Sequence, residues 1–561
     1  MSEKYSQASL KPPLQWPKDG VIKVRYEEEI QDLWACRYGT LTELMKEGVA
    51  RFGDREMLFF PDFNIRWSYN EFDTVVNNVA FCLQQDYGIQ KGERVAIMMN
   101  NIPEAFVMYL ALAQIGAISV IVNARLAGDE ALRQMEDSGC VAVAIEAPLW
   151  DSVKHFQGSL PDLRHMFISG AEENYSAIPL WGMMEKKAPR EVLVDVSERD
   201  ICSLIYTSGT TGKPKGTIIL HRGVVNNAMN CKYSLSKIYD PDTDISEWKQ
   251  LIVTPFFHVT TLHTLINLNL MGASAVAITT FSPEQVLNVL IDEEINFTII
   301  VAAMYWILSL QPRYPDLVKA NNLAYILQGG SPMPPEMCLR LSEDFPDSRI
   351  GNGYGFTEGA SAGWLLGMAG DWDTIISKPG SVGGALGNSG LRIVDPELND
   401  VARGETGEIL ACSPSISPGY WNLPEETAAS FFTDKQGRRW FKTGDLGYMD
   451  DEGYTYVVDR IKSMICRGGE NVYSVELENL ISLHPKVLEV GVVGVPDNVL
   501  GEKIKAVIWP VPGEILTVDE VKDFCRERIA DFKVPDYVVL TDTMLPKNPG
   551  GKLMKEELKK M

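Results

Sequence analysis

The chain has 561 residues, 45% of them hydrophobic and 23% charged, which indicates a globular protein too long for one hydrophobic core. With 52 Lys and Arg against 75 Asp and Glu, the net charge of −23 argues against nucleic acid as a partner, because phosphate backbones need clustered cations. Nine cysteines without a Cys-x-x-Cys pair fit free thiols, and six histidines without ligand spacing argue against a structural zinc. The N-terminus lacks the order of a signal peptide, so we expect a cytoplasmic protein.

The first third of the chain alternates between helix and strand patterns after an extended, proline-containing opening. Ser68 can cap the helix that starts at Tyr69. This alternation predicts βαβ units and a mostly parallel sheet with helices on both faces. The predicted elements are a helix over 40–52, a hairpin over 59–67, a helix over 69–84, a strand over 93–99, a helix over 105–114, a strand over 117–122, a helix over 129–137 and a strand over 141–145.

One stretch, residues 105–124, is almost wholly apolar and long enough to be compared with a membrane span. Polar residues interrupt it, among them Gln114, and Gly116 is followed by a β-branched run at 120–122. These features indicate a helix that ends near Gly116 and then a buried strand. We therefore expect no transmembrane segment.

The same alternation resumes near residue 200, and past about residue 380 Gly, Pro and Asp become dense between short β runs. The predicted fold class is α/β, with a large N-terminal domain of parallel α/β sheets over 1–458 and a β subdomain over about 380–458. The last hundred residues, 463–561, read as a small α+β domain. The further elements are helices over 222–233, 283–291 and 517–529, and strands over 201–205, 249–254, 297–302, 323–327, 391–394, 408–411, 454–458, 488–493, 504–509 and 537–540.

A loop at 206–216 follows the strand predicted over 201–205. It holds three glycines, three threonines, a serine and two lysines, a composition that offers backbone N–H groups, hydroxyls and cations to a phosphate chain. A Walker A loop would need glycine and Ser or Thr where this chain has Thr207 and Pro214, so this is a phosphate loop of another kind. A plain surface turn has no use for this density of hydroxyls and lysines.

Three further polar clusters follow predicted strands, at the strand ends where doubly wound sheets bind ligands. They are Gln-Gly-Gly-Ser at 328–331, a glycine-rich turn at 351–358 that ends in a hydroxyl and a carboxylate, and a Thr-Gly-Asp turn at 443–445. The glycines at 351, 353 and 355 do not have dinucleotide spacing. Together with the phosphate loop, these clusters predict one nucleotide site.

In their order along the chain, these motifs resemble those of adenylate-forming enzymes, and over nearly the whole chain the resemblance is to AMP-forming acyl-CoA synthetases. It is carried by residues 206–216, Gly-Tyr-Gly-Phe-Thr-Glu at 353–358, Thr443-Gly-Asp445 with Tyr448, Asp459-Arg460-x-Lys462, and Lys552. The resemblance implies two steps: a carboxylate attacks the α-phosphate of ATP and releases pyrophosphate, and coenzyme A then displaces AMP from the acyl-adenylate. It implies ATP, Mg²⁺ and coenzyme A as ligands.

The resemblance also implies a role for each nucleotide-site residue. Thr357 would hold the α-phosphate and Glu358 the Mg²⁺, while Tyr354 would lie against the adenine. Asp445 would accept from the ribose hydroxyls, with Arg460 alongside. The β- and γ-phosphates would lie against Thr207, Ser208, Gly209, Thr210, Thr211, Gly212 and Lys213, and the nucleotide would also contact Gly330, Ser331, Gly353 and Gly355.

The C-terminal domain would supply a catalytic lysine and then rotate. Lys552 would bridge the carboxylate and the α-phosphate, although Pro-Gly precedes its Gly-Lys pair where the family has Ser or Thr. Lys462 matches the usual hinge position, within a hinge at 459–462, and the domain beyond it would be mobile. Arg467, Gly468 and Gly469 resemble the loop that lines the tunnel for the coenzyme A arm.

The acyl substrate is less defined. An aromatic segment at 255–258 resembles the gate of the acyl pocket, and His258 is either a contact of the carboxylate or thiol or a packed histidine. Small residues in the pocket suggest a medium- or long-chain fatty acid. An aryl-CoA ligase of coumarate or benzoate type and a non-catalytic adenylate binder remain alternatives, and we expect a monomer or homodimer that acts on a small carboxylic acid. The pocket residues would be Phe257, His258, Val259, Thr260, Gly329 and Gly363.

Overall fold

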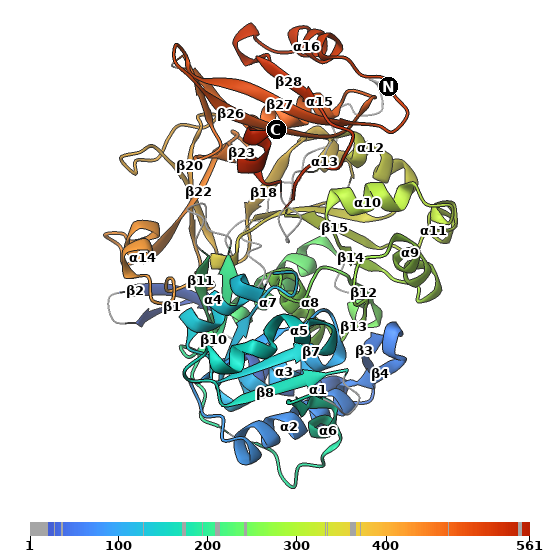
Figure 1. Ribbon diagram of the computed structural model, residues 1–561, viewed down its shortest axis with the longest axis vertical. Helices are drawn as coiled ribbons and strands as arrows, with labels where there is room; N and C mark the ends of the chain where they lie inside the picture. Colours follow the sequence, from blue (N-terminus) through green and yellow to red (C-terminus); the bar gives the residue numbers. More distant parts are fainter. Residues whose placement is uncertain are drawn as a thin grey trace.

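A computed structural model describes residues 21–26, 29–34, 38–126, 128–170, 175–192, 194–207, 214–239, 244–330, 333, 335–359, 366–370, 372–468, 470–547 and 553–561. Figure 1 shows a large N-terminal domain and, at the top of the view, a smaller C-terminal domain. The large domain contains parallel sheets with helices on their faces, which confirms the predicted α/β class.

The first sheet of the large domain is parallel except for its edge strand β11. The strands are joined in the order β11-β10-β6-β5-β7-β8-β9, and β11 runs antiparallel to β10. Because β10 and β11 form one hairpin, both ends of the predicted phosphate loop lie at the same edge of the sheet. The strands are β5 (Arg94–Met98), β6 (Ile118–Ile121), β7 (Ala142–Glu146), β8 (His165–Ser169), β9 (Ile178–Pro179), β10 (Ile201–Thr207) and β11 (Lys215–Leu220).

The second sheet is longer and joins the predicted β subdomain to the α/β part. Its strands follow the order β19-β20-β22-β23-β18-β17-β16-β15-β14-β12-β13-β3-β4, with β21 beside β22. The sheet is parallel from β3 to β16. Its neighbours on either side, β4 and β17, run antiparallel to these strands. Its strands are β3 (Glu56–Phe60), β4 (Ile65–Ser68), β12 (Lys249–Ile252), β13 (Ser274–Ala277), β14 (Phe297–Ile299), β15 (Tyr325–Gly329), β16 (Arg349–Tyr354), β17 (Leu366–Gly370), β18 (Ser381–Ala385), β19 (Gly390–Val394), β20 (Gly407–Cys412), β21 (Phe431–Thr433), β22 (Arg439–Met449) and β23 (Thr455–Arg460).

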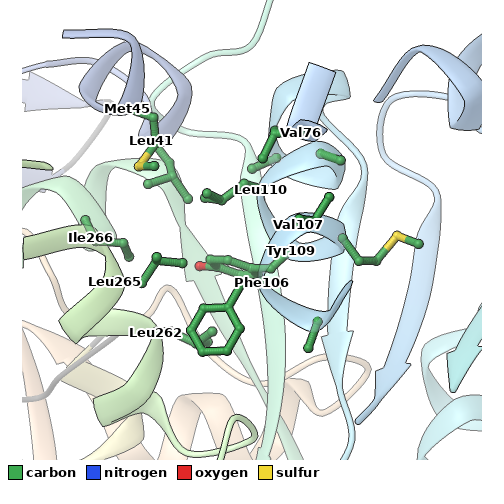
Figure 2. Close-up of a cluster of buried hydrophobic side chains, with 14 of the residues drawn as sticks. Leu41, Met45, Val76, Phe106, Val107, Tyr109, Leu110, Leu262, Leu265 and Ile266 are labelled. Carbon is green, nitrogen blue, oxygen red and sulfur yellow. The ribbon is translucent and has the colours of Figure 1, made fainter. Parts of the chain in front are cut away.

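The largest core lies between the two sheets, where helices α1, α2, α3, α7 and α8 pack together. Figure 2 shows side chains of α1, α2, α3 and α8 meeting, with Phe106 and Tyr109 of α3 facing Leu262 and Leu265 of α8. Helices α4 and α5 cover the outer face of the first sheet, and α9 to α13 cover that of the second. The helices are α1 (Leu41–Phe52), α2 (Tyr69–Phe81), α3 (Pro103–Ile115), α4 (Gly128–Ser138), α5 (Trp150–Val153), α6 (Leu180–Glu185), α7 (His221–Ile238), α8 (Val259–Met271), α9 (Pro283–Asp292), α10 (Ala302–Ser309), α11 (Tyr314–Ala320), α12 (Pro335–Asp344), α13 (Trp372–Ser377) and α14 (Pro424–Ser430).

Several local predictions are confirmed at the level of single residues. Ser68 caps α2 through a capping box with Glu71, so two backbone donors at the helix start are satisfied. Helix α3 ends at Gly116, whose φ of 69° is the left-handed conformation that glycine adopts without strain, and β6 follows. Within the described part of the chain, no helix combines the length and the apolar character needed to cross a membrane.

Other predictions differ from the structure. The strand predicted over 297–302 ends at Ile299, and α10 begins at Ala302. Helix α8 was not predicted, because it is buried on nearly every side and so lacks the one-sided apolar period of a surface helix. The turn predicted at 351–358 is strand β16 as far as Tyr354, and the Thr-Gly-Asp turn lies within β22. The extended opening segment includes a hairpin of β1 (Val21–Tyr26) and β2 (Glu29–Trp34).

The C-terminal domain is an α+β unit with its own sheet, in the order β25-β24-β27-β26 with β28 beside β27. Its core is separate from those of the large domain. Asp459 at the end of β23 accepts hydrogen bonds from the backbone N and the hydroxyl of Ser474 at 2.5 and 2.8 Å, and so fastens α15 to the large domain. The elements are β24 (Ile465–Arg467), β25 (Glu470–Val472), α15 (Ser474–Ser482), β26 (Val487–Asp497), β27 (Gly501–Pro510), α16 (Val518–Arg526), β28 (Tyr537–Leu540) and α17 (Lys555–Lys560).

Candidate active site

The base of the predicted phosphate loop is held rigidly. Tyr206 pairs with Gly216 across the hairpin of β10 and β11, and Thr207 pairs with Lys215. The Tyr206 hydroxyl donates to Asp137 Oδ2 at 2.6 Å. A Cβ at Gly216 would lie 3.1 Å from the Tyr206 ring, so any other residue at this position would require the ring to shift. The tip of the loop lies outside the described residues, and with it Ser208, Gly209, Thr210, Thr211, Gly212 and Lys213.

Glycines meet at the carboxyl ends of β15 and β16. Gly329 pairs with Gly353 across the two parallel strands, and Gly330 follows with a φ of 82°. One residue earlier on each strand, the Gln328 amide donates to Asn352 Oδ1 at 2.8 Å and so links the two strand ends. This edge therefore presents backbone without side chains, as a site for a flat or thin ligand would require. Ser331 and Gly363 lie outside the described residues.

A carboxylate cluster joins three of the predicted nucleotide residues. Asp445 on β22 is 6% exposed, pairs with Arg460 across β23, and forms an ion pair with it at 3.1 Å between Oδ1 and Nε. The Tyr354 hydroxyl donates to the other oxygen, Asp445 Oδ2. Burial and the neighbouring Asp445 charge raise the pKa of Tyr354 well above its usual value, so the phenol stays protonated and remains a donor. The cluster thus holds one carboxylate in a fixed orientation.

Glu358 lies in a single 3₁₀ turn, η6 (Thr357–Gly359), that packs against β11 of the phosphate-loop hairpin. Its Oε1 accepts a hydrogen bond from the Tyr420 hydroxyl at 2.8 Å. Burial raises the pKa of Glu358, whereas the Tyr420 hydrogen bond and the Arg460 charge lower it. Thr357 and Glu358 follow Tyr354, the last residue of β16, by three and four residues, so this turn lies next to the Asp445 cluster. The fold therefore brings the predicted residues Tyr354, Thr357, Glu358, Asp445 and Arg460 together.

The predicted acyl gate leads into helix α8. His258 is the residue that caps this helix, and its Nδ1 accepts from the backbone N of Thr260 at 3.2 Å. Phe256 is fully buried against Phe106, with 5.3 Å between ring centroids, whereas Phe257 is partly exposed. The cap gives His258 a structural role that the sequence left open. Val259 and Thr260 form the first turn of α8 and are buried.

Three residues that the sequence did not single out hold this region. Asn101 donates from Nδ2 to the carbonyls of Thr254 and Ile278 at 3.0 and 3.1 Å, and so ties the loop after β12 to the loop after β5. The guanidinium of Arg125 lies 5.8 Å from the centroid of the Phe257 ring. Tyr420 is the third residue. Its Gly-Tyr-Trp setting is apparent in the sequence, but only the fold shows that the Tyr420 hydroxyl reaches Glu358.

The residues predicted for hinge and coenzyme A binding lie on the C-terminal side. Lys462 is exposed and lies two residues after the end of β23. Arg467 and Gly468 belong to the hairpin of β24 and β25, where Gly468 has a φ of 63°. The Arg467 guanidinium forms two hydrogen bonds with Asp536, at 3.0 and 2.8 Å, within its own domain. Gly469 and Lys552 lie outside the described residues.

Comparison with known proteins agrees with this arrangement. The AMP-binding enzyme family matches residues 45–421, and the AMP-binding enzyme C-terminal domain matches residues 476–552. The chain is 31% identical to long-chain-fatty-acid–CoA ligase FadD13 of Mycobacterium tuberculosis, over 89% of this chain and 94% of that one. It is 32% identical to feruloyl-CoA synthase of an Amycolatopsis species, over 84% and 89%. The structure of o-succinylbenzoate coenzyme A synthetase from Bacillus subtilis with ATP and a magnesium ion superposes with a TM-score of 0.78, at 26% identity over 92% of this chain and 99% of that one.

The extent of these matches, together with the hydrogen-bonded carboxylates at one sheet edge, shows that the chain belongs to the AMP-binding enzyme family. Within that family it is an AMP-forming acyl-CoA ligase, which joins a carboxylic acid to coenzyme A through an acyl-adenylate. The resemblance of its motifs to acyl-CoA synthetases is thereby confirmed.

Proposed function

We propose that this ligase activates a medium- or long-chain fatty acid rather than an acid with a second charged group. The observation that carries the proposal is helix α8, which begins at the acyl gate and contains no Asp, Glu, Lys or Arg over Val259–Met271. A second carboxylate or an amine in the pocket would need an opposite charge to offset its desolvation. The 31% identity to a long-chain-fatty-acid–CoA ligase supports the same choice.

An aryl acid is the second candidate. It is favoured by the 32% identity to a feruloyl-CoA synthase and by the glycines at 329 and 353, whose lack of side chains leaves room for a flat ring. A ring of this kind and an alkyl chain both need an apolar pocket. The two candidates therefore differ in the shape of the pocket rather than in its charge.

For the nucleotide, we assign Asp445 to the ribose hydroxyls and Tyr354 to the adenine, with Arg460 holding Asp445. The phosphate loop from Thr207 to Lys213 would hold the β- and γ-phosphates, and Thr357 the α-phosphate. These groups have the hydrogen-bonding chemistry that their assigned roles need: hydroxyls and backbone N–H groups bind phosphate oxygens, and a carboxylate accepts from sugar hydroxyls.

Magnesium fits the residues present. Glu358 offers a carboxylate whose Oε1 is already hydrogen-bonded, and no group of three or more His, Cys, Asp or Glu side chains suited to a metal occurs among the described residues. Such a site suits Mg²⁺, which typically takes one or two protein carboxylates and completes its shell with phosphate oxygens and water. When bound, it would neutralise phosphate charge as the carboxylate approaches the α-phosphate.

The C-terminal domain would act twice. Lys552 would place its ammonium between the carboxylate and the α-phosphate in the first step, where two anions meet. Rotation about Lys462 would then bring Arg467, Gly468 and Gly469 to the coenzyme A arm for the second. Asp459, which joins β23 to Ser474, would be the fixed side of this hinge.

The test is carboxylate-dependent exchange of pyrophosphate into ATP, measured with the full chain across saturated fatty acids of increasing length and across benzoate, coumarate and ferulate. AMP release is measured in parallel with and without coenzyme A. We expect exchange to be highest with a medium or long fatty acid. A preference for ferulate or coumarate would establish the aryl alternative, and formation of ADP in place of AMP would contradict the proposed reaction.

A further inference from the structure

The Glu358 carboxylate sits on an element with little rigidity of its own. Its turn, η6, spans only Thr357–Gly359. A metal-binding carboxylate must nevertheless be ionised and must point one oxygen at the ion, and outer hydrogen bonds usually achieve both. Something outside the turn must therefore hold this side chain.

Tyr420 provides that hold. Its hydroxyl donates to Glu358 Oε1 at 2.8 Å. The segment that carries Tyr420 is attached to the same turn from a second side, because Ser417 N donates to the Glu358 carbonyl at 2.7 Å. Tyr420 itself is 8% exposed and packs against Phe431. The phenol is thus a fixed donor and not a mobile surface group.

The Tyr420 backbone is also attached to the phosphate-loop hairpin. Tyr420 forms an isolated antiparallel bridge with Thr217 on β11, and Trp421 N donates to the Gly216 carbonyl at 2.7 Å. The Lys215 ammonium lies 4.9 Å from the centroid of the Tyr420 ring, a cation–π distance. On its other side, Tyr420 N donates to Thr427 Oγ1 at 2.9 Å, which fixes the segment to α14. One residue therefore connects Glu358 with the strand that leaves the phosphate loop.

We propose that Tyr420 is a positioning residue for metal binding: its hydroxyl orients the Glu358 carboxylate, and its backbone bridge to β11 sets that carboxylate relative to the phosphate loop. This inference rests on the proposed role of Glu358 as the magnesium ligand. Tyr420 makes no contact with a reacting atom in this scheme. It acts through Glu358, so its loss weakens metal binding more than it slows the chemistry at saturating metal.

The test uses Mn²⁺ as the probe, with bound and free ion distinguished by electron paramagnetic resonance in the full chain with ATP and no acid; ATP alone is the reference. Tyr420→Phe keeps the ring against Phe431 and removes only the hydroxyl. We expect the Mn²⁺ dissociation constant to rise about tenfold, the lower end of what losing an outer hydrogen bond to a metal ligand costs.

The control is Tyr314→Phe, which removes a hydroxyl of the same kind, bonded to Asp344 Oδ2 at 2.7 Å in the outer helix layer. It should leave Mn²⁺ binding unchanged. If Tyr420→Phe does not fold, Thr427→Val, which removes the acceptor for Tyr420 N, should give a smaller rise in the same direction. Glu358→Gln tests the metal ligand separately from the positioning residue. Unchanged Mn²⁺ binding in Glu358→Gln would overturn the assigned metal ligand, whereas weak binding there with unchanged binding in the Tyr420 and Thr427 variants would overturn the positioning role alone.

Discussion

The nucleotide side of the active site and the C-terminal domain that would close over it are built in different ways. On the nucleotide side, Asp445 is held by Tyr354 and Arg460, and Glu358 by Tyr420, before any ligand arrives. On the C-terminal side, the Arg467 guanidinium is bound to Asp536 within its own domain. The first region is preorganised in one arrangement, whereas the second belongs to a unit joined to the rest through β23 and Asp459.

This difference has a consequence for a two-step reaction. A site for ATP gains from fixed dipoles and charges, because they need no reorganisation during the reaction. A domain that must serve two chemical steps gains from holding its residues in a rigid unit of its own, so that it can move as one body. Changes on the nucleotide side should therefore affect ATP binding, and changes on the C-terminal side should separate the two half-reactions.

The largest expected effect is that of Lys552→Ala. Removal of the ammonium leaves two anions to approach each other without a cation, and we expect pyrophosphate exchange to fall by about 10³-fold. Transfer to coenzyme A from a supplied acyl-adenylate should be largely retained. Lys559→Ala, in the same tail and paired with Glu556, serves as the control. Equal loss in both half-reactions would contradict the role assigned to Lys552. It would also contradict the expectation that changes on the C-terminal side separate the two half-reactions.

A smaller effect is expected from Asp445→Asn on the nucleotide side. The substitution keeps the shape but removes the charge that Arg460 and Tyr354 hold, so the KM for ATP should rise about tenfold, as for the loss of a hydrogen bond to a charged group. The KM for coenzyme A in the second half-reaction should stay within twofold. The control is Asp434→Asn, a carboxylate on the same subdomain that accepts from Trp440. An ATP KM that does not change would show that this cluster serves the fold rather than the nucleotide.

The smallest effect concerns the stability of the large domain. His221 at the start of α7 is fully buried, and its Nδ1 accepts from Leu41 N at 3.3 Å. Burial lowers the pKa of His221 from 6.5 to about 4, with Asp200 acting in the opposite direction and Lys91 in the same one. In the unfolded chain His221 is protonated below about pH 6.5, whereas in the folded chain it stays neutral down to about pH 4. Stability is therefore complete above pH 6.5 and is lost as the pH falls towards 4, by up to about 3 kcal/mol.

Thermal unfolding at pH 7.5 and pH 5.5 measures this effect. His221→Asn, which cannot take up a proton, should show a smaller decrease in the midpoint of the large domain than the parent chain does. His155→Asn, at an exposed position, should behave as the parent. The transition of the C-terminal domain should not respond to His221→Asn. A parent-like decrease in His221→Asn would assign the acid sensitivity to other groups.

Much of the fold could be predicted from local patterns. The capping box at Ser68, the helix stop at Gly116 and strand β28 over Tyr537–Leu540 depend on residues close together in the chain, so their signals are present in the sequence. Helix α8 lacked such a signal, because a helix buried on nearly every side has no polar face to mark its period. The glycines of β16 predict a turn from sequence, because glycine occurs in turns as well as in strands where two backbones approach closely.

The sequence by itself determined the chemistry of the site: a phosphate-binding loop, one carboxylate in each of two motifs, and the order that resembles acyl-CoA synthetases. Only the tertiary structure decided which groups hold those carboxylates. Tyr420 lies 62 residues from Glu358 and Tyr354 lies 91 residues from Asp445, and no local pattern links such pairs. The tertiary fold brings them together: β23, β18 and β17 lie between β22 and β16 in the sheet, and an isolated bridge holds Tyr420 beside β11. The two carboxylates are therefore held by residues that only the tertiary structure places beside them.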